Sequence, residues 1–234
     1  MRKTLINTAL TKKVALPVAI LVSFCLTFAI SCGNNAQPPS GALPTWNVGD
    51  TWTSRCFISG YEYTIVETVT GDQIYNGIDC YIVNKQSTGE EGSTGTEPML
   101  TITRAYDKNS LTAIRVETGH ALITNASCNY SVEPYPLSVG KTWTTTCNTT
   151  RTILPIEEHQ TTTETYSNTY TVEGAESITV PAGTFQCFKI VTYNSSSNAI
   201  INTKWVTDIT EGYTVKETDD SGITTELVSY SLSE

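Results

Sequence analysis

The stretch NVGDTWTSRC at residues 47–56 returns almost letter for letter as SVGKTWTTTC at residues 138–147, 91 positions further on. Self-similarity within one chain indicates a duplicated structural unit. Because the two copies lie at corresponding places in the chain, each is expected to open one half of the fold. We therefore predict two homologous halves, 46–136 and 137–234, within a single β domain that spans 46–234.

Two further matches follow in the same order along the chain. GIDCYIV at 77–83 is similar to TFQCFKI at 184–190, with a cysteine at the centre of each. Residues 103–131 match residues 203–231 without a gap, so that each position corresponds to the one 100 residues later. The spacings differ between the matches, which is expected if only loop lengths have changed between the halves.

Each half contains six short runs rich in Thr, Val, Ile and Tyr, residues that suit a pleated, half-buried surface. Gly, Asn, Asp and Ser gather between the runs and supply turns, and outside the N-terminal segment no window has helical periodicity. The sequence predicts an all-β fold, an antiparallel meander of about twelve strands that forms a curved sheet, half-barrel or barrel. The expected strands are 51–58, 61–69, 78–86, 99–106, 111–117, 121–131, 142–150, 161–173, 184–194, 200–207, 213–218 and 223–231.

The repeated stretches predict which side chains face inward. Successive residues of a strand point to opposite faces, so Trp52 and Cys56 share one face, as Trp143 and Cys147 do. Burial of each tryptophan is expected to contribute about 2–3 kcal/mol. Gly49 and Gly140 are expected to mark the bend into each strand.

The N-terminal segment predicts export and a membrane anchor. Residues 1–13 contain four basic residues and no acid, and an apolar run from Val14 to Ile30 follows. This pattern is typical of a secretory signal, although the long apolar run leaves an uncleaved anchor as an alternative. Ala29-Ile30-Ser31-Cys32 resembles the lipobox of bacterial lipoproteins, which implies a signal peptide at 1–31 and lipidation of Cys32.

Residues 32–45 are small, polar and rich in Pro and Gly, so we expect them to form a flexible tether. Without residues 1–31 the chain has ten basic and 23 acidic residues, a net charge of −13. A chain this acidic is a poor nucleic-acid binder, and without a basic patch it depends on its lipid to stay at a membrane. We expect an extracytoplasmic location in the cell envelope.

Five cysteines remain in the expected β domain: Cys56, Cys80, Cys128, Cys147 and Cys187. Exported thiols tend to pair, and two bridges among five cysteines allow fifteen connectivities. We favour Cys128 with Cys147, which could face each other across the junction of the halves. Cys80 and Cys187 hold equivalent places and could be buried free thiols.

A family resemblance lies mainly in residues 137–231. LSVGKTW, VEGAESITVPAGTFQCFKI, Trp205 and TELVSY together are similar to the TapB-like secreted proteins and lipoproteins of bacteria and archaea. The resemblance implies a curved antiparallel sheet, related in shape to the half-barrels of periplasmic lipoprotein carriers. It implies neither an established enzymatic activity nor any catalytic residue.

The sequence offers no catalytic constellation, so we predict a protein that is not an enzyme. His120 and His159 are the only histidines, and both lie among turn-like or Thr-rich residues. Nothing in the sequence indicates a nucleophile with a base and an orienting acid, so an unidentified hydrolase is the weakest alternative. No cysteine and histidine spacing indicates a metal site, and no cofactor is expected.

Two functions remain for a protein of this kind. The first is a membrane-anchored binding or envelope-structural module that contacts another envelope macromolecule. The second is a carrier of a lipid or other apolar ligand on the concave face of the sheet. Trp205 and Tyr193 are the candidate ligand-facing residues for the carrier.

Overall fold

A computed structural model describes residues 39–58, 61–89, 100–118, 121–153, 161–210 and 212–233, all within the compact unit Gln37–Glu234. This part of the chain has no helix that is long and apolar enough to cross a membrane. It contains twelve strands: β1 (Thr51–Ile58), β2 (Tyr61–Tyr75), β3 (Ile78–Gly89), β4 (Leu100–Asp107), β5 (Ala113–Thr118), β6 (Ala121–Tyr130), β7 (Thr142–Ile153), β8 (Thr161–Val180), β9 (Gly183–Asn194), β10 (Ile200–Val206), β11 (Thr214–Asp219) and β12 (Thr224–Ser231).

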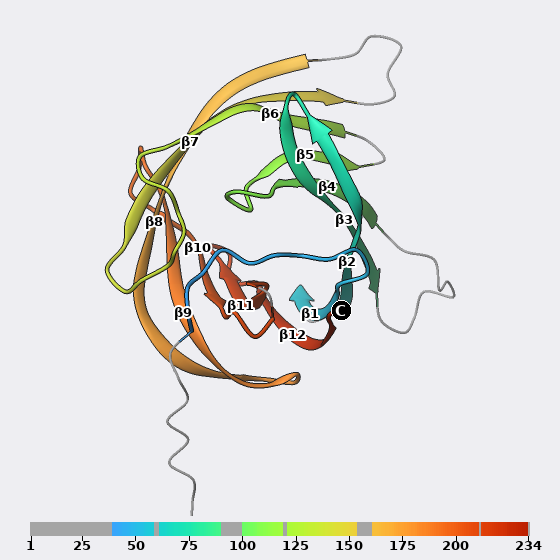
Figure 1. Cartoon of the computed structure of the whole chain (residues 1–234), viewed down its shortest axis with the longest axis vertical. Coiled ribbons are helices and arrows are strands. Elements are labelled where there is room, and N and C mark those ends of the chain that lie inside the picture. The colour runs from blue at the N-terminus through green and yellow to red at the C-terminus, as the bar shows by residue number, and fades with distance from the viewer. Residues whose placement is uncertain are drawn as a thin grey trace, which may run out of the picture. The chain divides into compact units, whose positions relative to one another are not determined.

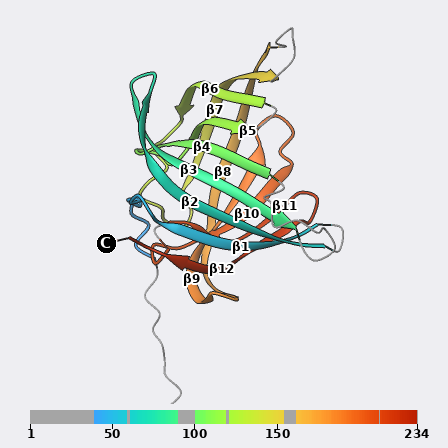
Figure 2. The same ribbon diagram turned by 90° about the vertical axis from the view of Figure 1, so that its right-hand side faces the viewer.

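The strands form one closed antiparallel barrel. Each strand pairs with the strand before it in the chain, and β1 pairs with β12 to close the sheet. Figure 1 looks into the barrel, and Figure 2 shows β1 to β5 running side by side along its wall. The predicted all-β fold is therefore confirmed, and among the three expected shapes it is the barrel that forms.

The predicted strand positions agree closely with the structure, except where two strands run on through a glycine. The predicted strands end at residues 69 and 173, whereas β2 and β8 continue to Tyr75 and Val180. In both strands the register shifts just before the glycine, between Val69 and Gly71 and between Val172 and Gly174. Such a bulge accommodates one extra residue without ending the strand.

The repeated stretches adopt the same backbone arrangement in both halves. Gly49 and Gly140 have positive φ values of 101° and 85°, as expected for glycines that bend the chain into a strand. The amide of Gly49 donates to the carbonyl of Val69 at 2.8 Å, and that of Gly140 donates to Val172 at 2.8 Å. The bulge follows directly after each of these valines. These matches are what a duplicated unit predicts; the common origin of the halves stays a prediction.

The longer sequence match needs one insertion. Arg104 on β4 is the register partner of Val116 on β5, whereas Lys204 on β10 is the partner of Glu217 on β11. Arg104 and Lys204 are 100 residues apart, but their partners are 101 apart. The connection between β10 and β11 therefore holds one residue more than that between β4 and β5, and the gapless match is wrong across it.

Among the described residues, the buried apolar side chains form three clusters. The largest surrounds Trp52, which is 1% exposed, and the second includes Trp143, so both repeated tryptophans are buried as predicted. The third cluster contains Cys80, Ala105 and Ile114. Strand β8 also contacts β11 and β12, which are not its neighbours in the sheet, because the long β8–β9 hairpin curls beneath them (Figure 1).

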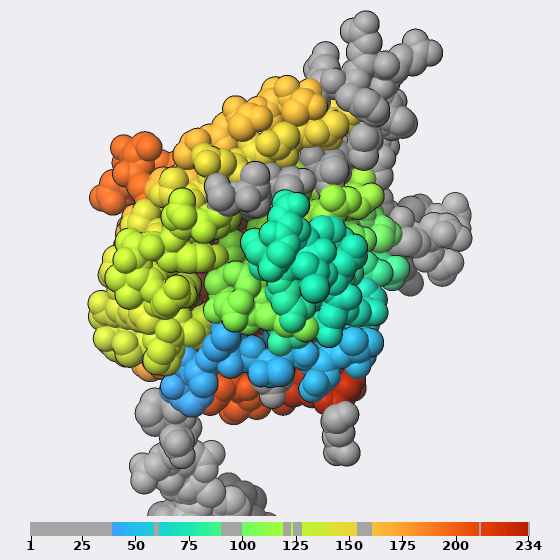
Figure 3. Space-filling model, turned by 45° about the horizontal axis from the view of Figure 1, so that its top comes forward, coloured from blue at the N-terminus to red at the C-terminus, as the bar shows by residue number. Residues whose placement is uncertain are grey.

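Residues 39–50, here called the strap, lie across one end of the barrel (Figures 1 and 3). The Ser40 amide donates to the Asp208 carboxylate at 2.9 Å, and the Gly41 carbonyl accepts from the Leu137 amide at 2.6 Å. The Trp46 ring lies 5.4 Å from that of Trp52. Residues 39–45, which the sequence analysis placed in the tether, thus lie against the barrel.

Candidate functional site: the barrel lumen

The lumen contains a cavity of about 780 Å³. Interior width grows with strand number, and about eight strands already give an interior that side chains just fill. Twelve strands leave more room than the inward side chains occupy. The volume falls within the range of ~300–1,000 Å³ that is usual for small-molecule sites.

The wall of the cavity is mixed in character. Its apolar part comes from strands all round the barrel, and its uncharged polar part consists of hydroxyl and amide groups. The apolar side chains include Ile65, Val116, Ile123, Leu137, Trp143, Ile190, Ile201 and Val206. The uncharged polar ones include Tyr106, Thr145, Thr149, Asn168, Tyr170, Thr192, Asn202 and Tyr213. A ligand with both polar and apolar parts would match such a wall.

One group of charges in the cavity is centred on Glu67. Its carboxylate lies 3.3 Å from Nζ of Lys85 and 3.8 Å from the Arg104 guanidinium, and it is close enough to the Tyr213 hydroxyl to affect the pKa of that phenol. Arg104 donates to the Tyr106 hydroxyl at 3.2 Å. Burial raises the pKa of Tyr213 well above its usual value, so this phenol remains a proton donor at neutral pH.

A second group of charges lies on β10 and β11. Nζ of Lys204 is 3.5 Å from the Glu217 carboxylate, and these side chains keep 39% and 32% of their surface accessible. Because both residues line the cavity, that surface faces the lumen. Nδ2 of Asn202 donates to Glu217 at 3.1 Å, while Oδ1 of Asn202 is buried and has no hydrogen-bond partner among the described residues.

The two residues expected to face a ligand lie elsewhere. The Trp205 indole donates to the Glu176 carboxylate and packs against the largest core cluster. The Tyr193 hydroxyl lies 3.3 Å from the carboxylate of Glu173. Neither residue lines the lumen cavity.

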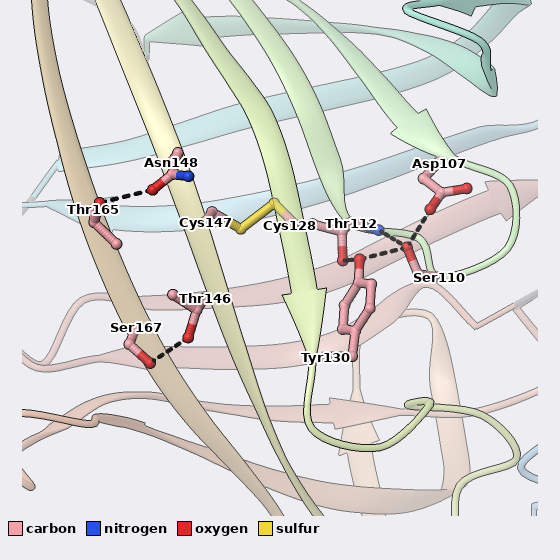
Figure 4. The surroundings of a disulfide bond; sticks show 10 residues. All are labelled: Asp107, Ser110, Thr112, Cys128, Tyr130, Thr146, Cys147, Asn148, Thr165 and Ser167. Carbon is pink, nitrogen blue, oxygen red and sulfur yellow. Dashed lines mark hydrogen bonds between the residues drawn. A yellow bond between two sulfur atoms is a disulfide. The ribbon is translucent and has the colours of Figure 1, made fainter.

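Cys128 and Cys147 form a disulfide, the pairing that the sequence analysis favoured. They are register partners on β6 and β7 (Figure 4), with Cα atoms 4.2 Å apart. These strands end the first predicted half and begin the second. Cys56, Cys80 and Cys187 are free and buried, which agrees with the expectation of free thiols at positions 80 and 187.

A hydrogen-bonded group next to the disulfide joins β6 to the β4–β5 turn (Figure 4). The Tyr130 hydroxyl lies 2.8 Å from the hydroxyls of Ser110 and Thr112. Ser110 in turn donates to the Asp107 carboxylate at 2.9 Å. The group contains a hydroxyl and a carboxylate but no imidazole, so it ties the turn to the wall and does not resemble a Ser/His/Asp nucleophile.

The predicted signal peptide at 1–31, residues 32–38 of the predicted tether with Cys32, and both histidines, His120 and His159, lie outside the described part of the chain. Within the described part, no group of three or more His, Cys, Asp or Glu residues is placed to hold a metal ion.

The charged lumen residues were missed, although the sequence carried a signal for them. Ile65, Glu67 and Val69 are buried at alternate positions of β2, so the acid is in phase with apolar neighbours on the same face. Lys204 is likewise in phase with Val206 on β10. A charge in the inward phase of a strand indicates either an internal ion pair or a polar lumen.

Comparison with known proteins gives only distant likenesses. No family model matches the chain, and no curated protein matches it, so the TapB-like resemblance stays a prediction. A candidate lipoprotein of Parabacteroides distasonis has 14% identity and a TM-score of 0.36, over 83% of this chain and 99% of its own. A candidate exported protein of Bacteroides fragilis with YmcC-like fold has 11% identity and a TM-score of 0.37, over 81% and 99%.

The hypothetical lipoprotein YmcC of Escherichia coli has 11% identity and a TM-score of 0.38, over 80% of this chain and 89% of its own. Likeness at this level does not establish a shared fold or function. The proposed function is therefore argued from the residues of this chain alone.

Proposed function

We propose that this protein is an exported, membrane-anchored, non-catalytic binding protein that holds a small ligand in the barrel lumen. The observation that carries the proposal is the cavity of about 780 Å³, with charged groups and apolar walls side by side. Small-molecule sites combine apolar walls with a few placed polar groups in this way. Of the two functions considered from the sequence, the cavity favours the carrier.

Because the barrel is closed, we do not expect a partner chain to bind by adding a strand to the edge of the sheet. An exposed edge strand offers unpaired backbone groups to another chain. Here β1 pairs with β12 from Thr51 to Phe57, so among the described strands this route is not available. An envelope macromolecule would have to bind the outer surface or the loops instead.

The anchor and the location are supported by the N-terminal sequence and by the disulfide. Cys32 follows an apolar run in a lipobox-like context, and the Cys128–Cys147 bridge suits an oxidising, extracytoplasmic compartment. Replacement Cys32→Ala should release the protein from membranes, as measured by cell fractionation. Cys25→Ala is the control and should leave it bound; retention of the Cys32→Ala protein would contradict lipid anchoring.

Binding in the lumen is tested by filling the cavity. Thr192 lines the cavity and is 3% exposed, so Thr192→Trp should occupy the space that a ligand needs. Thr101→Trp places the same side chain at an exposed position of β4. Native mass spectrometry of the extracted protein should show a bound small molecule in the wild type and in Thr101→Trp, but not in Thr192→Trp.

A second cavity-filling variant, checked for folding, separates loss of binding from loss of structure. Thr145→Trp fills the cavity from β7, and circular dichroism checks that each variant keeps its strands. A co-purifying molecule that persists in both folded filling variants would place the ligand outside the lumen and contradict the proposal.

A further inference from the structure

The lumen has a net positive charge in an acidic protein. The described residues that line it include three cations, Lys85, Arg104 and Lys204, and two carboxylates, Glu67 and Glu217. The whole chain, by contrast, has a net charge of −9. Low-dielectric walls focus the field of such enclosed charges, so an anion would gain more inside the barrel than on its outer surface.

Both lumen carboxylates already have partners within the protein, whereas the cations have N–H donors that no described protein group uses. The Glu67 carboxylate lies 3.3 Å from Nζ of Lys85 and 3.8 Å from the Arg104 guanidinium. The Glu217 carboxylate accepts a hydrogen bond from Asn202 and lies 3.5 Å from Nζ of Lys204. A guanidinium has five N–H donors and an ammonium has three.

Within the described part of the chain, Arg104 makes one hydrogen bond, to Tyr106, and one longer contact at 3.8 Å with Glu67. Lys204 has one partner at 3.5 Å. Both cations therefore retain N–H groups that can bind a ligand.

The two cations belong to different walls of the barrel and still act on each other. Arg104 is on β4 and Lys204 is on β10, strands that are not neighbours in the sheet. Burial and the nearby Arg104 charge lower the pKa of Lys204, but Glu217 and two phenols raise it by more. Both groups are therefore charged at neutral pH, and both line the same cavity, so an anion bound in it is attracted by both.

We infer that the lumen ligand is an anionic amphiphile whose carboxylate or phosphate group binds between Arg104 and Lys204. Its apolar body then lies against the wall formed by Trp143, Ile190 and Val206. This inference rests on the proposed lumen function and adds the class of the ligand. Arg104 can bind either oxyanion through two parallel N–H groups, and Lys204 adds a second charge.

The test uses probes that differ only in the headgroup. The full-length chain is titrated by calorimetry with dodecanoate, dodecyl phosphate and dodecanol, each below its micellar concentration, and with inorganic phosphate. Both anionic amphiphiles should bind at least about tenfold more tightly than dodecanol, as charge-assisted hydrogen bonds add to apolar burial. Inorganic phosphate should bind far more weakly than dodecyl phosphate.

Variants then locate the headgroup. Arg104→Gln and Lys204→Gln should each weaken the anionic amphiphiles by about tenfold and leave dodecanol unchanged. Lys216→Gln is the matched control, because Lys216 pairs with Glu226 at 3.2 Å and does not line the cavity. It should change none of the affinities.

Each contrary outcome has its own meaning. Equal affinity for dodecanol and the anions would overturn the anionic class and leave lumen binding intact. Equal affinity for inorganic phosphate and dodecyl phosphate would show that the apolar part of the ligand does not contribute to binding, and would contradict an amphiphilic ligand. Binding that Thr192→Trp does not abolish would overturn both this inference and the proposed function.

Discussion

Cys56 and Thr225 are register partners across the seam between β1 and β12, the two strands that close the barrel. Cys56 has no disulfide partner, whereas Cys147, its counterpart in the repeated stretch, is bonded to its own register partner Cys128. The barrel thus has a covalent link between its two predicted halves on one side but not on the other.

Replacement Thr225→Cys should create the missing link. Directly opposed residues of an antiparallel pair have the separation that a disulfide requires. The new bridge would close a loop of most of the barrel, for which chain entropy predicts a gain of up to about 5 kcal/mol in the free energy of unfolding. Peptide mapping without reductant identifies the bridge, and urea unfolding with and without reductant measures the gain. Thr225→Ser is the control, and two free thiols in the oxidised variant would contradict the seam register.

Replacement Gly212→Ala should loosen the strap. Gly212 has a φ of 70°, and a Cβ atom there would lie 2.0 Å from Cγ of Pro44 in the strap. Gly77 also has a positive φ, 82°, but a Cβ there would meet nothing within 4 Å. Gly77→Ala therefore reports the backbone strain alone, about 1 kcal/mol. Gly212→Ala should cost at least ~1 kcal/mol more and make the strap more susceptible to limited proteolysis; equal stability and proteolysis of the two variants would mean that the strap is not packed there.

Replacement Glu67→Gln should destabilise the barrel. The change leaves Lys85 and Arg104 without their carboxylate in the lumen, and loss of one partner of a buried ion pair costs roughly 3 kcal/mol. The double variant Glu67→Gln/Lys85→Gln should recover part of that loss. Glu117→Gln breaks a pair whose acid is 48% exposed, and should cost under ~1 kcal/mol. Urea denaturation measures all three, and equal losses for positions 67 and 117 would show that the lumen is as well hydrated as the surface.

The free energy of unfolding should fall as the pH rises above about 9. Burial raises the pKa of Cys187 from 9.0 to about 12 and that of Cys80 from 9.0 to about 11. Between these values the unfolded chain releases thiol protons that the folded chain keeps, so rising pH favours unfolding. Cys187→Ala should flatten the decline between pH 9 and 12, as followed by urea unfolding across that range. Rapid alkylation of Cys187 in the folded protein at pH 8 would contradict this.

The positions of the strands follow from local features of the sequence. Runs of Thr, Val, Ile and Tyr between turn residues placed β1 at 51–58, where the structure has it, and located the other eleven to within a few residues except at long strand ends. These preferences are local, because a pleated strand and a tight turn each depend on a few adjacent side chains. The ends of β2 and β8 were predicted wrongly at Gly71 and Gly174. Glycine favours both a turn and a bulge, and only pairing with the neighbouring strand distinguishes the two.

Tertiary structure alone decided the closure of the barrel and the contents of its lumen. Pairing of β1 with β12 joins residues about 175 positions apart, and no local preference specifies such a contact. Arg104 and Lys204 line the same cavity only because the sheet closes, since their strands are not neighbours in it. The sequence also made Trp205 a candidate to face a ligand. In the structure its indole hydrogen-bonds to Glu176 of β8 and packs against the largest core cluster instead. Which face of a strand becomes interior is set by the whole sheet and not by the strand itself.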